Sequence, residues 1–288
     1  MDTNLHTIRV ENHQLAYLAF NTQDPRPPLI LLHGLTSSVG FWHKGEPYTQ
    51  FGPCYALSLP GHYPAVAPAS FQQEMLSAKA LGGIVVAAIE QIVPDKPVTL
   101  VGHSAGGMVG LAAATQAPTK INHLITIAGF AQGHLTGPMG RLVRLAQWER
   151  VGWLLWPLFF LHRLHPALSQ WAFRAYATDR QTVTRDPSFA AAFASAYTYL
   201  KKLQPGSVWP YFQMMPQVDL VYRLPRIAAA TLVISGDKDP IVPPTQSEII
   251  ASRVPNSQLV MMPGVGHLPM MERPQQYNQI ISTWLNES

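Results

Sequence analysis

The pentapeptide Gly102-His103-Ser104-Ala105-Gly106 constrains this chain more than any other segment, because it joins an apolar run at residues 97–101 to a helix-like stretch. In such a junction the strand turns so sharply into the helix that the central serine is pushed out of the sheet in a strained backbone conformation. The flanking glycines avoid collisions with the neighbouring strand and helix. We therefore expect Ser104 to stand at the end of a sheet strand; a Gly/Ser-rich turn without function is the alternative.

Short apolar runs alternate with helical patterns along most of the chain. Runs at residues 7–10 and 14–20 predict a β-hairpin, and six more lie at residues 29–32, 54–59, 98–101, 124–127, 231–234 and 259–262. Helical patterns occupy residues 71–92, 105–116, 245–253 and 274–285. Buried strands that alternate with helices form βαβ units. We therefore expect an α/β fold with an eight-stranded, mostly parallel sheet flanked by helices.

Residues 131–216 break this alternation. They contain no convincing strand pattern, but they contain several apolar helical patterns separated by prolines, and five of the seven tryptophans. A helical insertion between two sheet strands predicts a cap, or lid, domain. The expected organisation is a core made of residues 1–130 and 217–288, with a helical cap at residues 131–216.

A serine hydroxyl is a weak nucleophile unless a base removes its proton, so a histidine and an acid that orients it are required. His267 follows the last apolar run on a glycine-rich loop, and Asp239 follows the run at residues 231–234. Loops at the carboxyl ends of parallel strands meet at one edge of the sheet. We predict a catalytic triad of Ser104, Asp239 and His267, with Asp237 as a turn residue that bonds its own backbone. A surface-loop role for His267 is the alternative.

Attack on a carbonyl group also needs hydrogen-bond donors that stabilise the resulting oxyanion. The backbone N–H of Ala105, at the start of the helix after the serine, is one candidate donor. The N–H of Leu35 is the second, because Gly34 lets that loop pass close to a substrate, and His33 is expected to brace the loop by hydrogen bonding. The alternative is that Leu35 is an ordinary loop residue.

With these motifs the chain resembles the α/β-hydrolase fold superfamily, in its serine hydrolase type with a helical cap. The resemblance covers nearly everything except the cap. It rests on the chain order Ser104, Asp239, His267 and on the motifs His-Gly at 33–34, Gly-His-Ser-Ala-Gly, Gly-Asp-Lys-Asp and Gly-His-Leu-Pro. It implies the α/β-hydrolase fold and acyl transfer by the triad.

Two features qualify this resemblance. Ser58 and Tyr63 stand where the family usually has an aspartate and a glycine. Serine at position 104 argues against the haloalkane dehalogenases and epoxide hydrolases, which resemble this chain but use an aspartate nucleophile.

The triad and the oxyanion loop together predict a serine hydrolase of the carboxylesterase or lipase kind, which cleaves a carboxylester or thioester bond through an acyl-enzyme. No metal and no organic cofactor is expected. Two alternatives stay open, because fold does not fix function. One is a non-hydrolytic enzyme of this fold, a lyase or a perhydrolase. The other is a ligand-binding or signalling protein that retains the triad.

The aromatic cap suggests a small, apolar, ester-like substrate. Candidate substrate-binding residues are Trp153 and Trp156 in the cap, and Trp42 and His103 near the predicted oxyanion loop. The alternative is that these aromatic residues form the core of the cap. The apolar run at residues 151–161, with Arg163 behind it, also allows contact with an anionic membrane surface.

Charge and composition limit the remaining partners. Residues 131–226 carry 11 Lys and Arg against four Asp and Glu, a net charge of +7, whereas the rest of the chain has a net charge of −3. No compact basic run or nucleic-acid motif accompanies this charge, so we expect no nucleic-acid partner. A single cysteine, Cys54, and the lack of a signal-peptide pattern favour a cytoplasmic location.

Overall fold

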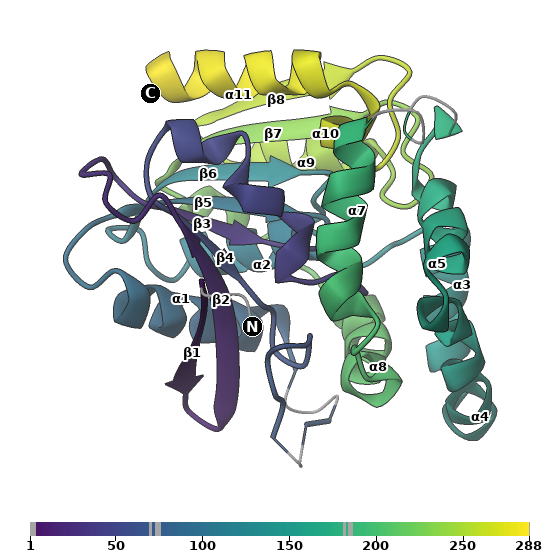
Figure 1. Cartoon of the computed structure of the whole chain (residues 1–288). Coiled ribbons are helices and arrows are strands. Elements are labelled where there is room, and N and C mark those ends of the chain that lie inside the picture. The colour runs from purple at the N-terminus through teal and green to yellow at the C-terminus, as the bar shows by residue number, and fades with distance from the viewer. Residues whose placement is uncertain (1–3, 69–70, 73–75, 181–182, 184–186, 288) are drawn as a thin grey trace.

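A single eight-stranded sheet forms the centre of the protein in a computed structural model, which describes residues 4–68, 71–72, 76–180, 183 and 187–287 (Figure 1). The order is β1-β2-β4-β3-β5-β6-β7-β8; β2 pairs antiparallel with β1 and β4, and all other neighbours run parallel. The expected eight-stranded, mostly parallel sheet is therefore confirmed. Its strands are β1 (Leu5–Val10), β2 (His13–Phe20), β3 (Leu29–Leu32), β4 (Cys54–Leu57), β5 (Val98–His103), β6 (Ile121–Ile127), β7 (Ala230–Gly236) and β8 (Ser257–Met262).

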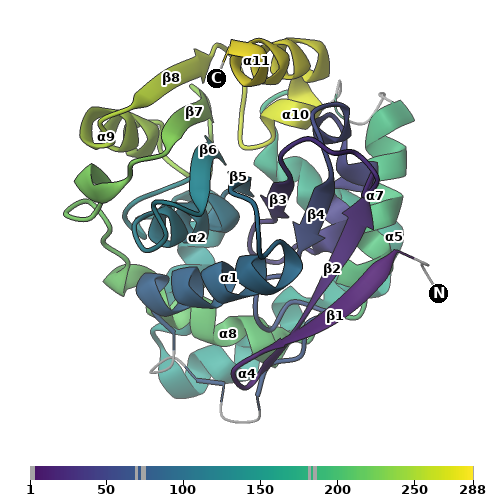
Figure 2. The same ribbon diagram turned by 90° about the vertical axis from the view of Figure 1, so that its left-hand side faces the viewer.

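Helices cover both faces of the sheet (Figure 2). One face carries α1 (Ala78–Ile92), α2 (Ala105–Ala114) and α9 (Thr245–Arg253), and the other carries α11 (Pro274–Glu287). Each face has its own apolar core. This double cover explains why the central strands read as continuous apolar runs, because their side chains are buried on both sides. Shorter elements on the second face are the 3-10 turns η1 (Val39–Phe41), η2 (His43–Gly45) and η3 (Tyr48–Gln50), and α10 (Pro269–Glu272).

The first long helix begins later than the pattern at residues 71–92 predicted. It starts at Ala78, after Ser77, whose φ of −143° and ψ of 160° are extended. The Ser77 hydroxyl accepts a hydrogen bond from the Ala80 N–H at 3.0 Å. Such a cap satisfies one of the donors that a helix start leaves free, so the helix begins at this serine. Residues 73–75 of the predicted helix lie outside the described residues.

The helical insertion (residues 131–216) lies between β6 and β7, over the carboxyl edge of the parallel strands, with α4 and α5 at its outer side (Figure 1). Its described residues contain no strand, in agreement with the sequence pattern. Within the described part of the chain, no helix combines the length and apolar character needed to cross a membrane. The helices of the insertion are α3 (Gly137–Ala146), α4 (Glu149–Phe159), α5 (Pro166–Phe173), α7 (Pro187–Leu200) and α8 (Pro205–Met214), with 3-10 turns η5 (Leu161–Leu164) and η6 (Arg174–Tyr176).

Ser58, the residue that departs from the family pattern, is fully buried just after β4. Its hydroxyl accepts the Ala16 N–H at 3.0 Å and donates to the Ala16 carbonyl at 2.8 Å. Its own backbone N–H donates to the same carbonyl at 2.8 Å. These bonds hold the loop after β4 against β2. An ionised aspartate at this position could not donate to the Ala16 carbonyl, because a carboxylate has no proton to donate.

Replacing Ser58 with alanine should lower the free energy of unfolding by about 1–3 kcal/mol, because the buried Ala16 N–H loses its hydroxyl partner. Urea unfolding followed by circular dichroism measures this change. The control is Ser252→Ala, in which an exposed hydroxyl bonded to the Ile249 carbonyl is removed; a change of under about 0.5 kcal/mol is expected there. Equal effects of the two substitutions would contradict a stabilising role for Ser58.

Candidate active site

Ser104 occupies a strained position between β5 and α2. Its φ of 55° and ψ of −119° lie outside the regions that a serine normally adopts. Two backbone bonds hold it there: its N–H donates to the Ile127 carbonyl at 2.8 Å, and its carbonyl accepts the Met108 N–H at 3.1 Å. Strain of this kind persists only where the surrounding structure fixes it, and it is concentrated at functional sites.

The two glycines of the pentapeptide are required by close packing. A Cβ on Gly102 would lie 2.3 Å from the Gly106 carbonyl oxygen, and a Cβ on Gly106 would lie 2.4 Å from the Leu32 carbonyl oxygen. These contacts are with backbone atoms, which cannot rotate away. The steric reason expected from the sequence pattern is therefore present in the structure: α2 approaches β5 and β3 too closely for any side chain.

Asp239 and His267 meet at the carboxyl edge of the sheet, on the loops that follow β7 and β8. The His267 Nδ1 lies 2.7 Å from the Asp239 Oδ2, and both side chains are almost completely buried. The other carboxylate oxygen, Oδ1, accepts the N–H groups of Ile241 and Val242 at 2.8 and 2.9 Å. With both oxygens engaged, the carboxylate is fixed in place and can orient the imidazole.

Asp237 has a different partner from the one predicted. Its Oδ1 accepts the Gly264 N–H at 2.6 Å and so ties the loop after β7 to the loop after β8, while its Oδ2 lies 3.9 Å from the Lys238 Nζ of its own turn. Gly264 adopts a φ of +71°, a conformation that side chains rarely tolerate. The sequence could not reveal this bond, because it joins residues 27 positions apart in two loops.

One cavity contains Ser104 and His267 in its lining. Leu35 and His103 also line it. Most of the remaining lining is apolar, and a large part comes from the helical insertion. Its apolar members are Phe41, Phe130, Leu135, Met139, Ala172, Phe173, Leu200, Ile241 and Leu268, beside Tyr176, His162 and Ser169.

The three tryptophans predicted to bind substrate do not line this cavity. Trp156 is fully buried and packs against Trp209 and Phe212, while its indole N–H donates to the Pro205 carbonyl at 2.7 Å. Trp153 is largely exposed on α4. Trp42 is buried on the far side of Phe41, edge-on to that ring at 5.0 Å. Phenylalanines and Tyr176 line the cavity where the sequence predicts tryptophan, and substrate binding by these tryptophans stays a prediction.

The loop after β3 lies against Ser104. A Cβ on Gly34 would lie 3.2 Å from the Ser104 Cβ, so only a residue without a side chain gives this spacing comfortably. Leu35 follows directly and lines the cavity, and Ala105 begins α2 with its N–H at the helix N-terminus, where partial positive charge favours an anion. Both predicted donors therefore belong to segments that border Ser104.

His33 braces this loop. The Leu59 N–H donates to its Nε2 at 3.1 Å, so Nδ1 carries the proton and donates to the Gly34 carbonyl at 2.8 Å. Burial lowers the pKa of His33 well below its usual range, which keeps the ring neutral in this arrangement.

His103 holds the backbone of His267, the candidate catalytic histidine, by a hydrogen bond. Its Nε2 donates to the His267 carbonyl at 2.9 Å, and its ring stacks on Phe41. Burial, with a smaller contribution from His267, lowers the pKa of His103 to about 3. A neutral ring adds no positive charge next to His267, so His103 acts here as a structural support.

The sequence did not identify two residues that join the insertion to the loop of His267. Tyr176 lines the cavity, hydrogen-bonds to the Thr36 side chain, and receives the His267 backbone N–H on its own carbonyl at 3.0 Å. Burial raises the pKa of Tyr176 to about 12, so its phenol stays protonated. No motif surrounds Tyr176 in the sequence, and nothing short of the tertiary contacts distinguishes it from the other nine tyrosines.

Glu272 is the second missed residue. This buried carboxylate accepts the Gly266 N–H at 3.0 Å on Oε1 and the Thr178 N–H at 2.9 Å on Oε2. It thereby joins the His267 loop to the insertion. A buried carboxylate needs such donors to offset its desolvation.

In the described part of the chain, no group of three His, Cys, Asp or Glu side chains is placed to hold a metal ion.

Comparison with known proteins gives the same fold throughout. A family model described as "alpha/beta hydrolase fold" matches residues 27–274. A protein of Stutzerimonas stutzeri provisionally named carbamate hydrolase RutD is 25% identical over 91% of this chain and 92% of its own. A pimeloyl-[acyl-carrier protein] methyl ester esterase of Nitrosomonas europaea is 23% identical over 91% and 97%. The structure of a thermophilic esterase from Thermogutta terrifontis aligns with a TM-score of 0.73 at 21% identity, covering 98% of both chains.

Acidification should destabilise the protein through its buried neutral histidines. Burial lowers the pKa of His62 from 6.5 to about 4, so between these values the unfolded chain binds the proton and the folded chain does not. The contribution of neutral His62 to the free energy of unfolding is therefore present above pH 6.5 and is lost as the pH falls toward 4. Between about pH 7 and pH 5, His62 should account for a loss of about 2 kcal/mol in the free energy of unfolding. Urea unfolding at both pH values should show a smaller loss in His62→Gln. The exposed-site control His134→Gln should keep the full loss, and an unchanged loss in His62→Gln would refute the assignment.

Proposed function

The chain belongs to the alpha/beta hydrolase fold family, and from that premise we propose that it hydrolyses carboxylic ester or thioester bonds with Ser104 as nucleophile, His267 as general base and Asp239 as the acid that orients it. The observation that carries the proposal is the buried bond between the Asp239 Oδ2 and the His267 Nδ1, on the rim of the cavity that also contains Ser104. The names of the relatives support hydrolase activity on ester-like bonds.

In the first half of the proposed reaction, His267 Nε2 takes the hydroxyl proton of Ser104 while Oγ bonds to the substrate carbonyl carbon. The carbonyl electron pair moves onto its oxygen, and the N–H groups of Ala105 and Leu35 stabilise the oxyanion. Collapse of this intermediate breaks the bond to the leaving group, which takes the proton from His267. An acyl-enzyme and a free alcohol or thiol result.

In the second half, water replaces the leaving group. His267 removes a proton from the water while the water oxygen attacks the acyl carbon. His267 then passes this proton to Ser104 Oγ as the acid product departs. Asp239 keeps the Nδ1 proton of the imidazole on the side away from Ser104. The bonds from the Ile241 and Val242 N–H groups favour the ionised carboxylate that this task needs.

The lining of the cavity supports an apolar group on the substrate. Phenylalanine, leucine and methionine side chains from both the sheet edge and the insertion surround Ser104, and they would be buried further by an acyl or alkyl chain. The insertion supplies several of these residues, which supports its assignment as a cap of residues 131–216 on a core of residues 1–130 and 217–288. A cytoplasmic location stays a prediction.

Substitution of Ser104 with alanine should lower the turnover of p-nitrophenyl esters by at least about 10,000-fold, because it removes the hydroxyl that attacks the carbonyl carbon. Labelling by a fluorophosphonate probe should vanish as well. Rates with wild type should rise with acyl chain length until the cavity is filled. Equal turnover by wild type and Ser104→Ala would disprove serine catalysis, and a lack of turnover by wild type on the whole series would favour a ligand-binding protein.

The two aspartates of the β7 loop provide a matched pair for testing the acid. Asp239→Asn should lower kcat by about 10,000-fold, because the imidazole would lose its orienting carboxylate. Asp237→Asn removes a carboxylate only two residues away, whose partner is the Gly264 N–H, so kcat should change by less than about threefold while the melting temperature drops slightly. The reverse pattern in steady-state kinetics would reassign the acid to Asp237.

A further inference from the structure

Helix α4 leaves most of its apolar side chains in solvent. Among residues 150–160, whose side chains are described, the buried ones are Gly152 and Trp156 in α4 and Phe160 just after it, at a spacing of one helical turn. A Cβ on Gly152 would lie 2.2 Å from the Leu145 carbonyl oxygen, so α4 packs tightly on α3 along this stripe. The opposite side is exposed and apolar, with Leu154 at 75% exposure.

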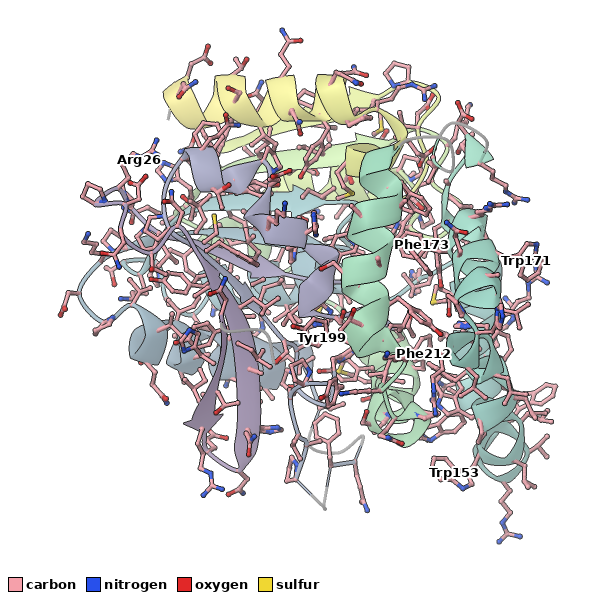
Figure 3. All side chains as sticks on the ribbon, viewed as in Figure 1. Arg26, Trp153, Trp171, Phe173, Tyr199 and Phe212 are labelled. Atoms are coloured by element: carbon pink, nitrogen blue, oxygen red, sulfur yellow. The ribbon has the colours of Figure 1, made fainter. Side chains whose placement is uncertain are left out.

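Helix α5 also has exposed apolar side chains on one side, while its other side faces the cavity. Ser169, Ala172 and Phe173 line the cavity, whereas Leu168 and Trp171 are exposed, the latter at 71%. Figure 3 shows Trp171 and Phe173 on opposite sides of this helix, with Trp171 pointing away from the sheet. We call the exposed apolar face of the two helices and the turn between them the α4–α5 surface; it comprises Val151, Trp153, Leu154, Leu155, Leu158, Phe159, Leu161, Leu164, Leu168 and Trp171.

Basic residues border this surface. Residues 141–174 contain five arginines and one acidic residue, Glu149. Arg141 and Arg144 are exposed on α3 beside Trp148, which is exposed too, and Arg150 is exposed at the start of α4. The other 15 acidic residues of the protein lie outside residues 141–174.

We propose that the α4–α5 surface docks on an anionic lipid bilayer. Soluble proteins rarely leave contiguous apolar surface of this extent unpaired. Apolar side chains with tryptophans among them, bordered by arginines, suit a helix pair that lies in the interface, with leucines among the acyl chains and arginines at anionic headgroups. At 11 residues, α4 is long enough to lie on a bilayer and too short to span one.

Charge favours a lipid surface over a second copy of this chain. A two-fold contact brings the same patch of both subunits together, so the arginines around one surface would face those around the other. Like charges opposed across an interface are unfavourable, whereas an anionic bilayer neutralises them. Docking would also place the short helix α5 between the bilayer and the catalytic cavity, because its two sides face these two environments.

Flotation with phosphatidylglycerol–phosphatidylcholine vesicles tests the proposal in the full chain. Wild type and Ser104→Ala should float equally, because docking does not depend on turnover, and binding should weaken in pure phosphatidylcholine and in high salt. The triple variant Leu154→Ser, Leu158→Ser, Trp171→Ser should lose more than about tenfold in partitioning. Tyr222→Ser, at a residue 87% exposed outside the surface, is the matched control and should bind as wild type does.

A second measurement, quenching of tryptophan fluorescence by lipid, uses variants that keep the surface apolar. Vesicles brominated in the acyl chains should quench the fluorescence of bound wild type. The variant with Trp148, Trp153 and Trp171 all replaced by phenylalanine should still float but lose most of this quenching, since the other four tryptophans are buried. Unchanged quenching in that variant would show that another face contacts lipid and would overturn the proposal.

Two further outcomes also reject it. One is the failure of wild type to float with either vesicle composition. The other is light scattering that gives a dimer for wild type and a monomer for the triple serine variant in the absence of lipid, which would make the α4–α5 surface an interface between copies of the chain. Hydrolysis of a water-soluble ester, unchanged from wild type, verifies that the serine variant is folded.

Discussion

The close approach of α2 to β5 and β3 is the constraint on which the site depends. Gly102 and Gly106 allow backbone to touch backbone at distances that a single methyl group would prevent. This packing forces the chain at Ser104 into a positive φ and fixes the direction of its side chain. It also sets the start of α2, and with it the position of the Ala105 N–H that we propose as an oxyanion donor. The strain at one residue is stabilised by the buried strands and helix around it.

The rest of the site is assembled by bonds between loops and the helical insertion. Glu272 links the loop of His267 to Thr178, and the backbone of His267 binds the carbonyl of Tyr176. The imidazole is therefore positioned by the insertion as well as by Asp239. A change in the placement of η6 would move the histidine, because the His267 N–H bonds to the Tyr176 carbonyl.

The strands, and the three residues proposed as the triad, could be picked out in the sequence because their causes are local. A buried parallel strand needs a continuous apolar run, and a strand that turns into a helix within two residues needs glycines at fixed positions. The edge of the sheet at which the loops meet follows from the parallel pairing. Tyr176 and Glu272 could not be identified in this way, because each bonds a partner 90 or more residues away: Tyr176 bonds His267, and Glu272 bonds Thr178.

The sequence by itself therefore determined the sheet, the junction at Ser104 and the candidates Asp239 and His267. The tertiary structure decided which aromatic residues surround the site. Trp153 and Trp156 stand three positions apart on one helix, yet one is exposed and the other is fully buried against Trp209, and neither reaches the cavity. The direction in which a helix faces depends on what it packs against, and for α4 and α5 that is fixed only when the insertion folds over the sheet.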